Sequence, residues 1–409
     1  MNEYQLDYPV VILIVGGVIF LVMLIKSGLD RTSIPSLVGF LILGFLIRLL
    51  DEKIGFFTKG CSEIFAFFAK IGLITLLFRV GLESNLRGLM GQLRRASVVW
   101  IGDLLISGFI GFVTAFYALN FHLLPSLIIA TAFTATSVGI SVSVWEETGA
   151  LKSSQGELLI DVAEMDDISA VVLMAMLFSV LPNLETGSNP ALLPVVSKVL
   201  VIFLVELFAF GAICFLFSQY AESPITHFFR TLESPPDPML VVVAIGFMIA
   251  AVADLLGFSL AIGAFFAGLV FSRDPDTVKM ETSFLPLYSL FSPFFFIGIG
   301  LDIDPGIMGE AFGMGAILLV AAILGKLIAD GVPVSLLAGI NSGILIGASM
   351  VPRAEIAMVI MQRGLRLGEW AVPTKAYAAM VVVSAVTCTL SPLVVRSLLK
   401  NPSWKGETS

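Results

Sequence analysis

Residues 158–181 read LLIDVAEMDDISAVVLMAMLFSVL, and this segment identifies the class of fold. It is long enough to cross about 30 Å of hydrocarbon, which takes roughly 20 residues of apolar helix. Yet its first half contains the acids Asp161, Glu164, Asp166 and Asp167. A charge at the centre of a membrane helix costs about 2.5–3.5 kcal/mol, so a group of them needs a reason. The alternative, that they cap a helix end or lie in an outer loop, is weakened because apolar sequence continues on both sides.

Similar apolar segments occur along the whole chain. Of its 409 residues, 57% are hydrophobic and 13% are charged, whereas soluble domains contain about 25% charged residues. Hydropathy predicts thirteen transmembrane helices, at residues 8–26, 34–50, 61–82, 96–120, 123–146, 157–182, 192–219, 238–256, 258–272, 283–301, 307–329, 340–363 and 372–399. We therefore expect an all-α polytopic membrane protein without a separate soluble domain.

Charge and cysteine usage restrict the partners. A net charge of -8 without a basic patch excludes nucleic acid. Cys61, Cys214 and Cys388 lie far apart, so neither a disulfide framework nor a zinc site is indicated, and no cofactor is expected. With the N-terminus outside, twelve Lys and Arg residues lie in inner loops and six in outer loops. This bias predicts an outer N-terminus and a cytoplasmic C-terminus.

Two predicted spans contain residues that interrupt helices. Residues 134–137 read TATS and precede Gly139, while residues 347–352 read GASMVP in the corresponding span of the second half. Unpaired backbone groups at this depth must face protein or a water-lined cavity. We expect two six-helix repeats of inverted topology, with crossed interrupted helices. Close helix packing through small residues is the alternative.

The paired aspartates indicate ion exchange. Adjacent helical residues point about 100° apart, so Asp166 and Asp167 cannot both face one small ion. One should face the ion and the other a fixed partner. A carboxylate that holds either a proton or a cation couples the two flows by competition. Because sodium prefers oxygen ligands, Thr136 and Ser137 are candidates for further ligands.

Basic residues within the spans are expected to compensate this charge. Lys326 either snorkels to an interface or pairs with Asp166, in which case it would lose a proton when the cation binds. Arg353 is expected to fix the interrupted helices by pairing with Glu164 or Asp161. It cannot face Glu355 at a spacing of two residues.

Other residues received a structural assignment. Asp103, Glu206 and Asp254 are single intramembrane acids, expected in interhelical hydrogen bonds or at interfaces. His122 and His227 lie at the edges of predicted spans and form no metal-binding pattern.

Several motifs in this order carry a family resemblance. They are TATSV at 134–138, Asp166-Asp167 one span later, Lys326 in the third span from the end and PRAE at 352–355, with LFRVGLE at 77–83 and GAFFAG at 263–268. Together they resemble the monovalent cation:proton antiporter family, in its bacterial branch with two adjacent aspartates. The usual family glycine is replaced by Ala354.

The resemblance implies a bacterial inner-membrane homodimer that exchanges protons for sodium or lithium in pH homeostasis. Exchange would be electrogenic and would use an elevator motion. Asp167 would be the main ligand of cation and proton, and Asp166 would pair with Lys326. The implied domains are 1–95 and 231–305 for dimerisation, 96–190 and 306–409 for ion transport, and 191–230 as a linker helix.

Other functions compete with this interpretation. A potassium/proton antiporter of the same family is the main alternative, although potassium-efflux relatives carry a nucleotide-binding domain after the last span and this sequence ends ten residues after Leu399. An ion-coupled symporter or a channel on the same scaffold is a further alternative. An intramembrane aspartyl protease needs two carboxylates that share a proton, which neighbours on one helix do not favour. We therefore expect the protein to be a transporter and not an enzyme.

Overall fold

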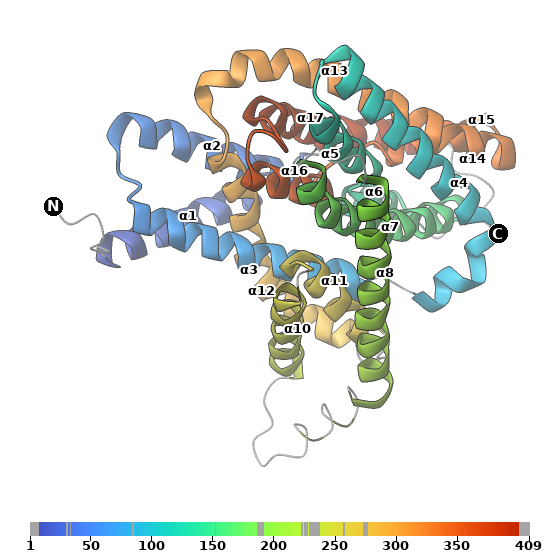
Figure 1. Ribbon diagram of the computed structural model, residues 1–409, viewed down its shortest axis with the longest axis horizontal. Helices are drawn as coiled ribbons and strands as arrows, with labels where there is room; N and C mark the ends of the chain where they lie inside the picture. Colours follow the sequence, from blue (N-terminus) through green and yellow to red (C-terminus); the bar gives the residue numbers. More distant parts are fainter. Residues whose placement is uncertain are drawn as a thin grey trace. The chain divides into compact units, whose positions relative to one another are not determined.

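The computed structural model is helical throughout its described part (Figure 1). The structure describes residues 8–29, 32, 34–83, 86–151, 153–185, 192–221, 224, 228, 238–256, 258–272 and 277–400, and no β-strand occurs among them. The helices are α1 (Tyr8–Leu29), α2 (Ser36–Ile54), α3 (Lys59–Glu83), α4 (Leu86–Val113), η1 (Thr114–Ala118), α5 (Leu123–Thr134), α6 (Val138–Glu147), α7 (Ser154–Glu185), α8 (Leu192–Leu216), η2 (Phe217–Ala221), α10 (Pro238–Leu255), α11 (Leu260–Phe271), α12 (Thr277–Leu301), η3 (Pro305–Ile307), α13 (Met308–Ala329), α14 (Gly331–Ala338), α15 (Ile340–Ser349), α16 (Glu355–Leu367) and α17 (Thr374–Lys400). The predicted all-α class is confirmed.

The predicted apolar segments correspond to these helices. Segments 123–146 and 340–363 are each divided into two helices, α5 with α6 and α15 with α16. The turn expected at 256–258 falls between α10 and α11, with Gly257 outside the described residues. His227 and Lys152 also lie outside them. The short helix α14 is an addition that the hydropathy pattern did not predict.

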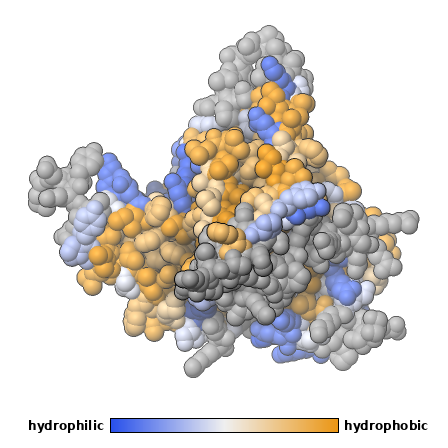
Figure 2. All heavy atoms as spheres, turned by 90° about the horizontal axis from the view of Figure 1, so that it is seen from below, coloured by the Kyte–Doolittle hydropathy of each residue, from blue (hydrophilic) through white to orange (hydrophobic). Residues whose placement is uncertain are grey.

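Length and hydropathy fit a membrane environment. Among the described residues, seven helices are long and apolar enough to cross a membrane, and four shorter helices are also apolar. Large apolar side chains are exposed along α1 and α8, for example Leu13 and Phe208, which are 76% and 82% exposed. Figure 2 shows one face of the molecule, where apolar residues cover much of the described surface. Soluble proteins rarely expose apolar patches of this extent, whereas lipid tails in a membrane would cover them.

The helices form two compact units. Unit 1 comprises residues 1–19, 57–86 and 175–298, and unit 2 comprises residues 20–56, 87–174 and 299–409. Unit 2 contains most of the segments expected to transport ions, together with α2 and the last part of α1, whereas residues 175–190 of the expected transport segment 96–190 fall in unit 1. The labels of transport domain and dimerisation domain stay predictions.

Within unit 1, α3 and α11 approach each other through glycines. A Cβ on Gly81 would collide with the backbone of Phe265, and a Cβ on Gly268 would collide with the backbone of Phe78 and Leu82. Small residues allow such backbone contact, which drives helix association where no hydrophobic effect operates between helices. Gly81 of the motif at 77–83 and Gly268 of the motif at 263–268 therefore make one helix crossing.

Candidate functional site

Two interrupted helices meet at the centre of unit 2. Residues 135–137 separate α5 from α6, and residues 350–354 separate α15 from α16. Pro352 explains one interruption, because proline disfavours helical backbone at the preceding residue and has no N–H to donate. The Ser137 N–H donates to the Pro352 carbonyl at 2.8 Å, which joins the two interruptions directly. The expected interruptions are present, and they lie together.

Further hydrogen bonds hold α6 against the end of α15. The Ser141 hydroxyl donates to the Ser349 carbonyl, and the Trp145 indole N–H donates to the Ser349 hydroxyl at 2.9 Å. All three residues are buried. An unpaired polar group here would be costly, so these contacts position both half-helices.

The carbonyl end of α5 is satisfied by side chains from other helices. The last carbonyls of a helix have no backbone N–H partner within that helix. The Ser107 hydroxyl donates to Phe133 O at 2.8 Å, and Lys326 Nζ donates to Thr134 O at 3.4 Å. Arg353 Nη1 donates to Ala135 O. Two cations at this end also complement the negative pole of the half-helix dipole.

Asp166 brings its carboxylate to this interruption from the middle of α7. Its Oδ2 atom accepts hydrogen bonds from Lys326 Nζ and from the Thr136 hydroxyl, each at 2.9 Å. The residue is only 1% exposed. The Trp100 indole donates to the Ser169 hydroxyl, which donates to the backbone carbonyl of Asp166, each at 3.0 Å, so α4 is tied to this turn of α7.

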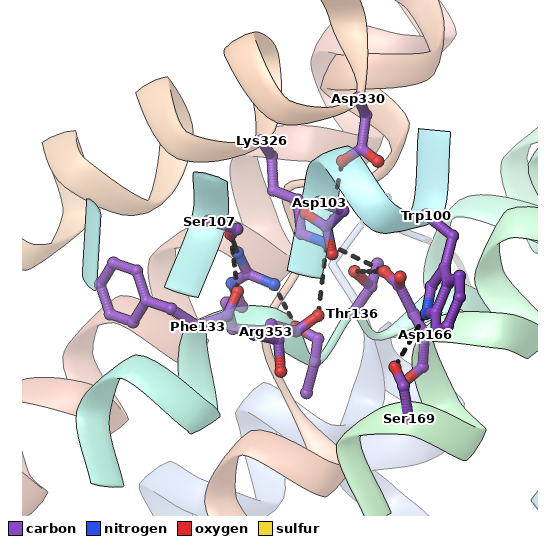
Figure 3. A network of polar contacts seen from close by, with 12 residues as sticks. Trp100, Asp103, Ser107, Phe133, Thr136, Asp166, Ser169, Lys326, Asp330 and Arg353 are labelled. Carbon is purple, nitrogen blue, oxygen red and sulfur yellow. Dashed lines mark hydrogen bonds and ion pairs between the residues drawn. The ribbon is translucent and has the colours of Figure 1, made fainter. Parts of the chain in front are cut away.

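Lys326 lies at the centre of the polar cluster (Figure 3). Its Nζ atom is 2.5 Å from Asp103 Oδ2, 2.9 Å from Asp166 Oδ2 and 3.7 Å from Asp330 Oδ2. The lysine, Asp103 and Asp330 are all 0% exposed. The three nearby carboxylates offset the cost of burying an ammonium group.

Arg353 contacts neutral oxygens. Besides Ala135 O, its guanidinium donates to the Ser107 hydroxyl at 3.1 Å and lies 5.8 Å from the ring centroid of Phe133. Among the described residues, no ion pair joins it to Asp161. The side chain of Glu164 lies outside the described part, so the acidic partner expected for Arg353 stays a prediction.

The remaining predicted residues lie close by. The Ser137 hydroxyl donates to Glu355 Oε2 at 2.5 Å, so the acid at the start of α16 reaches the interruption after α5. Asp167 follows Asp166 on α7 and is half-buried. The structure therefore brings Thr136, Ser137, Asp166, Lys326 and Glu355 into one region of unit 2.

Sequence reasoning missed two members of this cluster. It expected Asp103 in interhelical hydrogen bonds or at an interface, outside the ion site, and did not consider Asp330. The spacing of Asp330, four residues after Lys326, was an available signal, because such residues share a helix face. Nothing in the sequence around Asp103 indicated which helix it would meet.

Crossed interrupted helices with a buried carboxylate at their meeting point define a class of membrane transport proteins. Residues 17–401 match the family model described as "Sodium/hydrogen exchanger, transmembrane". The chain therefore belongs to the sodium/hydrogen exchanger family. This confirms the resemblance and the prediction that the protein is a transporter and not an enzyme, while membership of the two-aspartate branch stays a prediction.

Individual relatives agree with the family. A "Na(+)/H(+) antiporter" of Enterococcus hirae is 29% identical over 90% of this chain and 93% of its own length. The "K(+)/H(+) antiporter subunit KhtU" of Bacillus subtilis is 27% identical over 96% of each chain. Among solved structures, the sodium proton antiporter MjNhaP1 of Methanocaldococcus jannaschii shares the fold, with a TM-score of 0.70 over 98% of this chain and 100% of its own, at 17% identity.

Proposed function

We propose that this protein is a secondary antiporter that exchanges protons for sodium or lithium across the cytoplasmic membrane. The cation and the proton take turns on the carboxylates Asp166 and Asp167, with Thr136 and Ser137 as further oxygen ligands. We assign charge compensation and coupling to Lys326, Arg353, Glu164 and Glu355.

One observation carries this proposal: the Asp166 carboxylate, 1% exposed, lies at an interrupted helix and shares its Oδ2 atom between Lys326 and Thr136. A cation that approaches Asp166 must compete with the ammonium and with any proton on the same oxygens. Such competition couples two ion flows without any covalent step. The half-buried neighbour Asp167 offers a second carboxylate on the same turn of α7.

Potassium/proton exchange is the second candidate. The Bacillus subtilis relative, described as a K(+)/H(+) antiporter subunit, matches as much of this chain as the sodium relatives do. Selectivity between these ions depends on ligand distances of a fraction of an ångström. The test must therefore include sodium, lithium and potassium.

The expected transport cycle follows the family pattern. We propose a homodimer in which the helices of unit 2 that hold the site move as a body across the membrane and expose the carboxylates to either side in turn. Exchange is expected to be electrogenic. The site supports this scheme because it is built from buried contacts among several helices, which can move together without being disassembled.

The experiment is a proteoliposome exchange assay with a pH-sensitive dye inside. Added sodium should drive proton flux through the wild type, and the flux should respond to a clamped membrane potential. Asp167→Asn should abolish it, because a neutral amide offers neither a charge nor an exchangeable proton.

Asp254→Asn is the matched control, since Asp254 is an exposed acid on α10 in unit 1. It should exchange at the wild-type rate. Full sodium-driven proton flux in Asp167→Asn would remove the assignment of the site. Flux driven by potassium alone would replace sodium with potassium as the substrate.

A further inference from the structure

Lys326 is held by more carboxylates than the exchange mechanism requires. Its closest ion-pair partner is Asp103 at 2.5 Å, not Asp166 at 2.9 Å. Asp330, the residue directly after α13, lies at 3.7 Å. The charges of all three acids, and of Arg353, act on the ammonium. A site that needed only the pair of Lys326 and Asp166 would not contain two further buried acids.

Within the described part of the chain, Lys326 is the one ion-pair partner of Asp103. Among the described residues, neither of its carboxyl oxygens has an aligned hydrogen-bond donor, and the same holds for Asp330. Both side chains are 0% exposed, so neither carboxylate reaches bulk solvent. A buried carboxylate without a compensating charge or donor is strongly unfavourable. The ammonium of Lys326 therefore compensates the buried charge of Asp103.

The charges of the fully buried groups define a balance. Among the described side chains, three carboxylates (Asp103, Asp166 and Asp330) and two cations (Lys326 and Arg353) are at most 1% exposed. With all five ionised, one negative charge remains. One monovalent cation or one proton on Asp166 neutralises it while Lys326 keeps its own proton. If Lys326 lost its proton as the cation bound, a negative charge would remain buried.

We propose that Asp103 is a positioning residue that keeps Lys326 charged throughout the exchange cycle. The inference rests on the proposed function. When a cation takes Asp166, the ammonium withdraws toward Asp103 and stays paired, instead of losing its proton. When the cation leaves, Lys326 returns to Asp166. Asp103 thus lowers the cost of releasing Asp166 and thereby sets the apparent affinity for the transported cation.

The test is a double-mutant cycle on sodium-driven proton flux in proteoliposomes. Asp103→Asn should raise the apparent KM for sodium about tenfold or more, because the ammonium then has only the more distant Asp330 as an alternative to Asp166. The maximal rate should change much less. In a Lys326→Gln background, the same substitution should change KM by no more than about twofold, because no ammonium has to be accommodated.

Two variants control for general effects. Asp103→Glu keeps the counter-ion and should hold KM near the wild-type value. Asp254→Asn removes an acid of unit 1 and should leave KM unchanged. Equal rises in KM with and without Lys326 would overturn the proposal, because that result means general electrostatic attraction or a structural defect. An unchanged KM in Asp103→Asn would overturn it as well.

If Asp103→Asn does not purify as folded protein, Asp330→Asn replaces it. Its KM should rise in the same direction by a smaller factor, since Asp330 is 3.7 Å from the ammonium. An unchanged KM for sodium in Asp330→Asn would count against the role of Asp103 and Asp330. Wild-type protein that exchanges neither sodium nor potassium for protons would refute the proposed function itself. Wild-type exchange with equal effects in both backgrounds would reject only the role of Asp103.

Discussion

Arg353 shows how one side chain can hold two interrupted helices in place. It belongs to the interruption before α16 and is 0% exposed, yet its guanidinium donates to Ala135 O after α5 and to Ser107 on α4. Its own backbone N–H donates to the Thr387 hydroxyl of α17 at 3.2 Å. The residue therefore connects four parts of unit 2, and its charge complements the carbonyl end of α5.

Replacing this arginine should destabilise the protein strongly. Arg353→Ala leaves the Ala135 carbonyl without its donor and removes a buried charge that offsets nearby carboxylates, so we expect a loss of about 2–4 kcal/mol in the free energy of unfolding. Denaturant unfolding in detergent micelles, followed by tryptophan fluorescence, measures it. Arg396→Ala is the control, because the Arg396 and Glu147 side chains are 39% and 57% exposed and such pairs contribute about 1 kcal/mol or less. Equal losses in the two variants would contradict the role of Arg353.

At the scale of elements, helices meet in two ways in this protein. In unit 1, α3 and α11 pack backbone against backbone through Gly81 and Gly268. In unit 2, α5, α6, α15 and α16 are joined by polar contacts at their interruptions. The first type of contact needs the absence of a side chain, and the second needs donors and acceptors in matched positions. The two types should therefore respond differently to substitution.

The glycine crossing gives the prediction at this scale. Gly268→Ala places a methyl group against the backbone of Phe78 and Leu82, and overpacking of this kind costs about 1–3 kcal/mol. Gly16→Ala on α1 is matched to it, because nothing lies within 4 Å of the added Cβ. Thermal unfolding in detergent should show a lower midpoint for the first variant only. A midpoint for Gly268→Ala at or above that of Gly16→Ala would exclude a close crossing of α3 and α11.

At the scale of the whole molecule, contacts between helix ends agree with the predicted order of membrane crossings. Arg396 near the end of α17 pairs with Glu147 at the end of α6. Gln362 on α16 donates to Asp302, just after α12, at 2.9 Å. The loop count assigns the first pair to the inner side and the second pair to the outer side. Each pair thus joins two helix ends that are predicted to lie on the same side of the membrane.

The predicted orientation can be tested by labelling. Cys61, Cys214 and Cys388 are buried, at 1%, 6% and 0% exposure, so they should react slowly with a membrane-impermeant maleimide. In intact cells, an outer N-terminus predicts that Asp304→Cys is labelled, whereas Glu147→Cys is labelled only after the membrane is opened. The opposite pattern would reverse the orientation without changing the fold.

Much of the architecture followed from local sequence. Hydropathy located the helices because each transmembrane segment must be apolar by itself, whatever its neighbours are. Pro352 and the run at 134–137 indicated the interruptions, because proline and hydroxyl side chains act on the backbone beside them. The cost of burying charge identified Asp166 and Lys326 as members of a site. These inferences depend only on residues close together in the chain.

The partners of these groups were decided only by the tertiary structure. Lys326 and Asp166 are 160 positions apart, and Asp103 lies on a third helix, where the sequence offered no sign of its neighbour. Arg353 bonds to a backbone carbonyl, which carries no signature in the sequence. An ion pair depends on distances of a few ångström between helices, and the hydropathy of each helix leaves its rotation and neighbours free. The sequence therefore determined the helices, their interruptions and the presence of buried charge, whereas packing determined which acids share Lys326.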